Sequence, residues 1–263
     1  MELQVLAVGD VVGTNGLLFL KKHLRSLRRE LGADFCVVNG ENASGVGLTP
    51  QQADTIFDSG ADVITLGNHT WNRREICTYL DENRYILRPA NFLPSLPGRG
   101  WGIFETNKGP VAVVNLIGRC EMDFNPDNPF YAADRILGEL GDVPIFVDFH
   151  AEATSEKLAM AYHLDGRVCA LWGTHTHVPT ADTMLLPNGT GYQTDLGMVG
   201  PIRSVIGVRP EQSIAMFRGE LTSRFEVADG PCRLCAAVFT VDTEKRRCIK
   251  AERVVLDETA SRG

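Results

Sequence analysis

The chain has 263 residues, of which 44% are hydrophobic and 22% charged, and its formal net charge is -7. No apolar run approaches the roughly 20 residues of a membrane-spanning helix, and the N-terminus lacks the basic segment of a secretory signal. We therefore expect a cytoplasmic protein that contacts no membrane. The acidic balance disfavours an extended nucleic-acid surface, and seven scattered cysteines disfavour a disulfide framework.

The first part of the chain alternates strands with helices. Residues 3–10, 35–42 and 61–69 are apolar runs with strand composition, and helix-like segments at 15–31 and 48–60 separate them. This alternation predicts a largely parallel sheet.

Both helices carry clear sequence signals. The first is amphipathic, because its leucines recur at spacings of three and four: Leu17, Leu20, Leu24, Leu27 and Leu31. The second has Thr49 as its cap, Pro50 in its first turn and Gly60 beyond its end.

The pattern becomes mixed from about Trp101. Residues 102–118 predict a hairpin that turns at 107–109, and residues 232–257 predict two strands joined around 242–247. Between them lie strands at 143–150 and 167–177 and a helix at 155–166. A parallel half with antiparallel hairpins predicts two sheets packed together with helices outside. We find no repeat or linker-like boundary, so we expect one domain over residues 1–263.

Five apolar strands end in side chains that can bind metal. Ligands collect outside the carboxyl ends of strands in α/β sheets, so these side chains can converge although they are distant in sequence. They are carboxylates, amides and imidazoles, which suit iron, manganese or zinc. The candidates are Asp10, Glu41 with Asn42, Asn68 with His69, His150, and His175 with His177.

The pair His175 and His177 favours two ions over one. On an extended segment, residues two apart point to the same side, about 7 Å apart at the backbone. That spacing suits one histidine on each of two ions lying roughly 3.5–4 Å apart. A carboxylate would bridge such ions, and Glu41 is well placed to do so.

Each candidate taken alone has an ordinary structural explanation. Asp10 could cap the following helix, Asn39 and Gly40 could form a turn, His69 could cap a helix, and His150 could be a hydrogen-bonded core residue. Five independent strand ends would all need such explanations, and the histidine pair has none. The coincidence favours a metal site.

Four other polar residues are not site candidates. Cys232 and Cys235 lie in a strand-like segment, no second pair completes a zinc site, and residues three apart on a strand face opposite ways. His23 lies among lysines and arginines of a helix, and we expect it on the surface. His163 lies near a helix end, where a histidine suits the helix dipole.

A dinucleotide-binding turn is the competing interpretation of the first strand and loop. Glu41 follows the second strand, as a ribose-binding acid would. The glycines fall at Gly9, Gly13 and Gly16, however, which does not match the G-x-G-x-x-G spacing. That interpretation also leaves the histidines without a role.

Several long sequence blocks resemble the YmdB family of bacterial phosphodiesterases, within the calcineurin-like metallophosphoesterases. They are "GDVVG", "NGENASG", "GADVITLGNHTW", "RPANF", "DFHAEATSEK" and "GTHTHVPTAD". The similarity runs from about Leu3 to Leu256. The usual D-x-H of the superfamily is here Asp10-Val11-Val12, and its G-D-x-x-D is replaced by "NGEN".

The resemblance implies an α/β fold, a four-layer α/β/β/α sandwich of two mixed sheets, with a dinuclear site for iron or manganese ahead of zinc. It also implies hydrolysis of 2',3'-cyclic nucleotides, with 3',5'-cAMP as another substrate, by a dinuclear-metal hydroxide mechanism in which His69 is the catalytic acid. One metal would take Asp10, Glu41, Asn42 and His177, and the other Glu41, Asn68, His150 and His175.

A regulatory protein whose metal site senses iron or redox state, with incidental hydrolysis, is the alternative function. The complete ligand set with an acid beside it favours the enzyme. Neither the metal nor the physiological substrate is fixed by the sequence, and the oligomeric state, homo-oligomer included, stays open.

Overall fold

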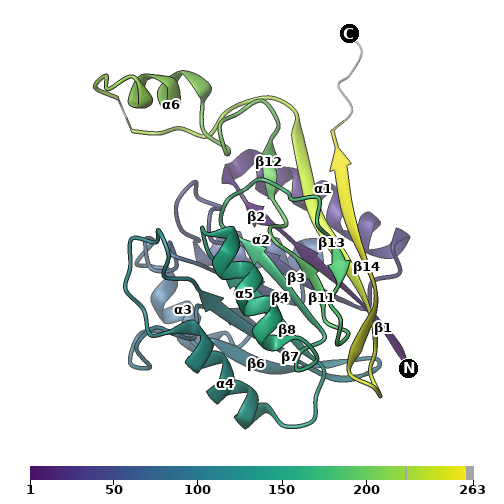
Figure 1. Ribbon diagram of the computed structural model, residues 1–263. Coiled ribbons are helices and arrows are strands. Elements are labelled where there is room, and N and C mark those ends of the chain that lie inside the picture. The colour runs from purple at the N-terminus through teal and green to yellow at the C-terminus, as the bar shows by residue number, and fades with distance from the viewer. Residues whose placement is uncertain (223, 259–263) are drawn as a thin grey trace.

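Two β-sheets lie face to face at the centre of the computed structural model, which describes residues 1–222 and 224–258 (Figure 1). The larger sheet has eight strands in the order β2-β12-β13-β1-β3-β4-β5, with β14 paired to β13. The smaller has six in the order β10-β11-β9-β8-β7-β6. The end of the expected domain, residues 259–263, lies outside the described part.

The larger sheet begins with the predicted alternation of strands and helices. Its parallel strands are β1 (Glu2–Val8), β3 (Phe35–Asn39), β4 (Val63–Thr65) and β5 (Ile86–Leu87). The connecting helices are α1 (Gly13–Glu30), α2 (Pro50–Ser59) and α3 (Ile76–Glu82). The predicted cap of α2 is confirmed: Thr49 accepts a hydrogen bond from the Gln52 amide, and Gly60 ends the helix with φ 114°. The sequence reasoning did not find α3.

Segments from the end of the chain complete the larger sheet. They are β12 (Met198–Pro201), β13 (Cys232–Asp242) and β14 (Arg247–Asp257), with the short β2 (Asp10–Val11) at the edge. A Cβ on Gly9 would lie 2.0 Å from the Gly197 carbonyl oxygen, and one on Gly16 would lie 2.1 Å from that of Val199. These two glycines therefore allow the close approach of residues 197–199.

The smaller sheet contains the predicted hairpin and the two predicted central strands. The hairpin is β6 (Trp101–Thr106) with β7 (Gly109–Ile117), followed by the parallel strands β8 (Ile145–His150) and β9 (Ala170–Thr174). Two short strands, β10 (Met184–Leu185) and β11 (Gly191–Gln193), extend it. Its helices are α5 (Thr154–Leu164), as predicted, and α4 (Pro129–Leu140), which was not.

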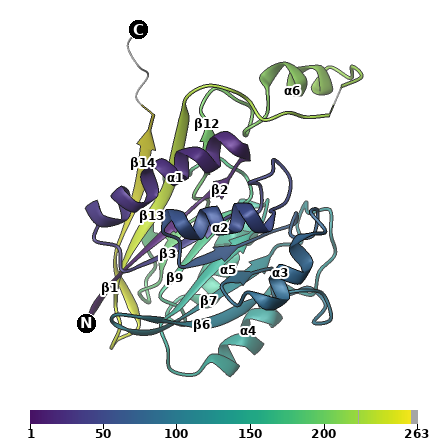
Figure 2. The same ribbon diagram turned by 180° about the vertical axis from the view of Figure 1, so that it is seen from behind.

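Alternating side chains of the strands build three apolar layers. In β1, Leu6 and Val8 face α1 and α2, whereas Val5 and Ala7 face the other sheet, as the two-residue period of a strand requires. A third layer packs the smaller sheet against α4 and α5. The helices α1 and α2 thus cover one side and α4 and α5 the opposite side (Figures 1 and 2). The expected α/β/β/α sandwich is confirmed.

The segment between β12 and β13 leaves the sandwich. Its helix α6 (Pro210–Phe217) stands away from the sheets (Figure 1) and exposes Ile214, Phe217 and nearby Leu221. No helix in the described part of the chain is both long enough and apolar enough to cross a membrane.

The two histidines outside the candidate site behave differently. His163 lies in the last turn of α5, as expected, with its Nε2 atom 2.9 Å from Asp134 Oδ1. His23, which we expect on the surface, is half-buried. Its ring packs against Phe19 at 4.4 Å between centroids, because α1 turns this position toward its apolar face, and burial lowers its pKa.

Candidate metal centre

The candidates at the strand ends lie together, where the carboxyl ends of strands from both sheets meet. Asp10 follows β1, Glu41 and Asn42 lie in the turn after β3, and Asn68 and His69 follow β4 in the larger sheet. His150 ends β8, and His175 and His177 follow β9 in the smaller sheet. The ordinary explanations fail for two of them. Val12, not Asp10, is the N-cap of α1, and Glu75 precedes α3. Asn39 and Gly40 do lead into a turn, in which the Ala43 amide donates to the Gly40 carbonyl.

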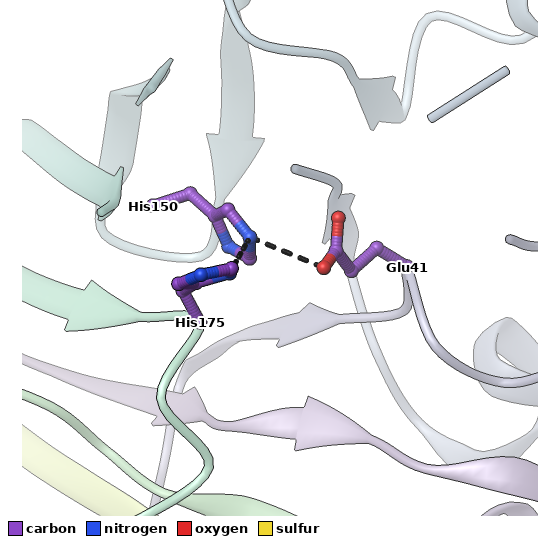
Figure 3. Close-up of side chains that lie close together, drawn as sticks. All are labelled: Glu41, His150 and His175. Carbon is purple, nitrogen blue, oxygen red and sulfur yellow. Dashed lines mark hydrogen bonds and ion pairs between the residues drawn. The ribbon is translucent and has the colours of Figure 1, made fainter. Parts of the chain in front are cut away.

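His150 lies at the centre of the cluster. Its Nε2 atom is 3.1 Å from Glu41 Oε1, 2.9 Å from Asn68 Oδ1 and 3.1 Å from His175 Nδ1. Figure 3 shows Glu41 and His175 both directed at this ring atom. Glu41, His150 and His175 form a group whose ligand atoms all lie within 4.8 Å of one another. One proton can satisfy only one of these contacts, whereas a cation can satisfy all of them.

The hydrogen bond on its other ring nitrogen fixes the orientation of His150. The Thr174 hydroxyl donates to Asp148 Oδ1 at 2.7 Å, so its oxygen accepts from His150 Nδ1 at 2.9 Å. The Nδ1 proton is therefore committed outward, and Nε2 faces the cluster. Metal-binding histidines commonly use their second nitrogen in this way, which sets the tautomer and the ring orientation.

His175 and His177 have the same arrangement. The outward Nε2 atom of His175 lies 3.2 Å from Glu152 Oε2, and His177 Nδ1 donates to the Ile206 carbonyl at 2.8 Å. Each ring thereby directs its unprotonated nitrogen toward the cluster. Burial, the neighbouring His150 and other charges lower the pKa of His175 to about 3, so this ring is neutral at physiological pH.

Asp10 supplies a buried oxygen whose hydrogen-bonding capacity is unused. Its Oδ2 atom accepts from the His175 amide at 3.2 Å, but Oδ1 has no hydrogen-bond partner among the described residues. Oδ1 lies 3.9 Å from His177 Nε2 and 4.0 Å from His150 Nδ1. Burial raises the pKa of Asp10 to about 7, against the effect of both histidines. A buried acceptor in this state costs free energy unless a cation or a proton compensates it, so the residues fit a bound metal.

Glu41 and His150 form an ion pair in the absence of metal. Burial would raise the pKa of Glu41, but the charge and the hydrogen bond of His150 lower it to about 2. Burial would lower the pKa of His150, but Glu41, with Asp10 and Asp148, raises it to about 9. A proton on His150 Nε2 thus occupies the place that a cation would take.

Gly67 leaves the space in which these groups meet. A Cβ at this position would lie 2.3 Å from His150 Nε2 and 2.4 Å from Glu41 Oε2. No other residue type fits here without displacing both side chains.

His69 and Asn42 lie beside the cluster. The His69 amide donates to Glu41 Oε2 at 3.1 Å, and its half-buried ring contacts the Asn68 and Asn72 amides through Nε2 and Nδ1. The Asn42 Nδ2 atom donates to Glu41 Oε1 and lies 3.1 Å from His177 Nε2. Both residues therefore lie next to the Glu41 carboxylate.

The expectation of an extended segment at His175 and His177 is wrong. Strand β9 ends at Thr174, and both histidines have positive φ values, 102° and 65°. Such values are strained for residues other than glycine and persist only where the surroundings enforce them. The tight turn directs one ring toward His150 and the other toward Asp10.

A cavity of about 840 Å³ opens in front of the cluster. His69, Glu41 and Glu152 are among the polar residues that line it. Its lining also includes apolar residues: Val46, Val178, Ile206, Phe225 and Val227. Its volume is sufficient for a small-molecule ligand.

The sequence reasoning missed the residues that support the histidines: Asp148, Glu152 and Thr174. Asp148 had a readable signal, since it precedes His150 by two residues in an apolar strand and therefore shares its face. Glu152 and Thr174 had none beyond their nearness to candidates.

The chain matches the family model described as "YmdB-like protein" over residues 6–254. It is 42% identical to the 2',3'-cyclic-nucleotide 2'-phosphodiesterase of Bacillus subtilis, over 97% of this chain and 98% of that protein. A solved structure of a phosphatase from Mycoplasma pneumoniae aligns with a TM-score of 0.93 and 35% identity, covering 100% of this chain and 96% of that one. A hypothetical protein from Thermus thermophilus aligns with a TM-score of 0.91 and 39% identity, covering 97% and 100%. With the fold, the site geometry and these likenesses in agreement, the chain belongs to the YmdB-like protein family.

Proposed function

We propose that this protein is a metal-dependent phosphodiesterase that hydrolyses 2',3'-cyclic nucleotides. The observation that carries the proposal is the environment of His150 Nε2, where a carboxylate, an amide oxygen and a second imidazole lie within 3.1 Å. The substrate class is supported by the 42% identity to the Bacillus subtilis enzyme across nearly the whole of both chains.

We assign two metal positions that share the Glu41 carboxylate. Asp10 Oδ1, which has no hydrogen-bond partner among the described residues, supports a second metal position. His177 would contribute to this position, and so would Asn42 once its amide oxygen and nitrogen are exchanged. Cations held there supply charge that polarises a phosphoryl group and lowers the pKa of water. This donor set accepts iron, manganese or zinc, and the family resemblance favours iron or manganese. The sets are Asp10, Glu41, Asn42 and His177 for one position, and Glu41, Asn68, His150 and His175 for the other.

His69 acts as the general acid in this proposal. Its amide is anchored to Glu41, so its ring stays beside the cluster on the cavity wall without being needed as a ligand. As an imidazolium it donates a proton to the ribose oxygen that leaves phosphorus. The apolar residues of the cavity lining, which include Val178 and Phe225, would hold the base of the nucleotide.

A substrate panel run with the iron, manganese and zinc forms tests the proposal. We expect saturable hydrolysis of 2',3'-cyclic nucleotides that chelation abolishes and added metal restores. Glu41→Gln should lose bound metal and activity together, as measured by elemental analysis beside the assay. Stoichiometric metal with no turnover on cyclic or linear phosphodiesters would sink the enzymatic function and favour a metal-sensing protein.

A further inference from the structure

A buried ion pair next to the candidate site has no role in the proposed chemistry. Lys157 on α5 and Asp195, after β11, are 0% and 1% exposed, and Lys157 Nζ lies 2.7 Å from Asp195 Oδ2. A buried pair of this kind is weak evidence for a role in stability, because apolar replacements of both partners are often neutral or stabilising. Its presence here therefore calls for another explanation.

The Asp195 carboxylate connects this pair to the turn that carries the site histidines. Its Oδ2 atom also accepts from the Thr176 amide at 3.1 Å, and its Oδ1 atom accepts from the Gly197 amide at 2.8 Å. Thr176 is the residue between His175 and His177. Asp195 thus binds the centre of a turn in which both flanking residues have positive φ values.

The neighbouring strand is built to let the lysine reach this position. A Cβ on Gly173 would lie 1.8 Å from the Thr194 carbonyl oxygen and 2.8 Å from Lys157 Cδ. The Lys157 side chain therefore passes directly over Gly173 of β9, and the Thr194 carbonyl approaches the same glycine. Three separate segments meet here: α5, the end of β9 and residues 194–197.

We propose that the Lys157–Asp195 pair is a positioning device that holds the turn from His175 to His177 in the strained form that directs both rings at the metals. Lys157 fixes the carboxylate, and the carboxylate fixes the Thr176 amide. Asp195 needs both oxygens to bind the Thr176 and Gly197 amides together. This inference rests on the proposed metal site, but not on the proposed substrate.

Three variants separate this role from a purely structural one. Lys157→Met leaves a buried carboxylate unpaired and should lower the Tm of the metal-free protein by roughly 10 °C. The double variant Lys157→Met with Asp195→Asn has no unpaired charge, so its Tm should recover most of that loss. Its asparagine has a single oxygen for two amides, so its affinity for Mn²⁺ should stay roughly 10–100-fold below wild type. Met160→Ala, a fully buried position on the same helix, is the matched control, with a Tm loss of roughly 5–15 °C and unchanged Mn²⁺ affinity.

Mn²⁺ affinity is measured from the EPR signal of the free ion, and Tm by calorimetry with chelator present. The positioning role is overturned if Mn²⁺ affinity follows Tm through all the variants, or if the double variant binds Mn²⁺ like wild type. Should Lys157→Met fail to fold, the charge-neutral double variant carries the test alone. Wild-type protein that binds Mn²⁺ but hydrolyses no cyclic nucleotide would overturn the substrate proposal and leave this one intact. Wild-type protein that binds no Mn²⁺ would overturn both.

Discussion

The Nε2 atom of His150 and the Nδ1 atom of His175 face each other at 3.1 Å, with the two rings inclined at 70°. Each ring has its other nitrogen engaged by a different partner, Thr174 in one case and Glu152 in the other. If both rings were neutral, the unprotonated nitrogen of one would face the unprotonated nitrogen of the other, and no hydrogen bond could form between them. The contact is explained by a positive charge between or beside them.

His69→Ala should lower kcat by roughly 10²–10⁴-fold and leave the bound metal unchanged, because the ring would donate a proton without completing a metal site. Steady-state kinetics beside elemental analysis of the same sample measures both quantities. His69→Gln is the matched control, since it keeps polar bulk at the cavity wall but cannot act as an acid. An emptied site, or undiminished turnover, would show that His69 has a different role.

Thr174→Val should weaken metal binding by roughly 10–100-fold, since it removes the acceptor that orients the His150 ring. Thr65→Val is the control. Thr65 donates to Asp148 Oδ2, whereas Thr174 donates to Asp148 Oδ1 and also accepts from the His150 ring. Isothermal titration with Mn²⁺ compares the two variants. Equal losses in both would mean that the charge environment of Asp148, rather than the Thr174–His150 bond, governs the affinity.

Gly67→Ala should abolish metal binding, because its methyl group would fall within 2.4 Å of both His150 and Glu41. Gly138→Ala is the matched control in helix α4, where the added Cβ meets nothing within 4 Å. That variant should bind metal normally and gain up to about 1 kcal/mol from helix propensity. A Gly67→Ala protein with full metal content and a wild-type Tm would contradict the packing described here.

The metal-free protein should lose stability as the pH rises from about 6.5 to 9. The folded-state pKa of His150 is raised to about 9, so its contribution is complete below the unfolded value of 6.5 and lost as the pH passes through 9. Asp10, raised from 3.8 to about 7, adds a loss of the same sign at lower pH.

Urea unfolding with chelator present, at half-unit steps of pH, measures this dependence. Asp10→Asn should remove the Asp10 contribution below about pH 7 and also reduce the loss above it, because the Asp10 charge helps to raise the pKa of His150. The metal-loaded protein should instead bind its ions more tightly as the pH rises, because they displace these protons. A metal-free stability that does not change across this range would argue against the ion pair between ionised Glu41 and protonated His150.

Much of the site could be predicted because its ligands occupy a repeated position. Asp10, Glu41, Asn68 and His150 each stand at the end of an apolar strand, and parallel strands bring their carboxyl ends to one edge. The two central strands of the smaller sheet, β8 and β9, could be predicted from the same pattern of an apolar strand followed by a polar residue. The pattern of α2 was equally clear, since the cap at Thr49 and the glycine beyond its end are local signals.

The rest depends on contacts between distant segments. Nothing near Lys157 indicates that it reaches Asp195, because a lysine on a helix is ordinarily solvated. The turn at His175 takes its form from that distant carboxylate, which is why an extended geometry was expected there. The missed helix α4 did carry a local signal, with Asn128 as its cap and Pro129 at its start. The path of β12 beside β2 is set by close packing at Gly9 and Gly16, which no local pattern encodes.

The donors of the cluster come from both sheets, Glu41 and Asn68 from the larger and His150 and His175 from the smaller. An ion bound by all four would therefore link the two sheets to each other. Withdrawing it should increase amide hydrogen exchange at the ends of β3 and β8 together, although these strands belong to different sheets. A shortage of transition-metal ions would then weaken the contact between the two sheets, and the rate of proteolysis in the cell would rise as the metal supply falls.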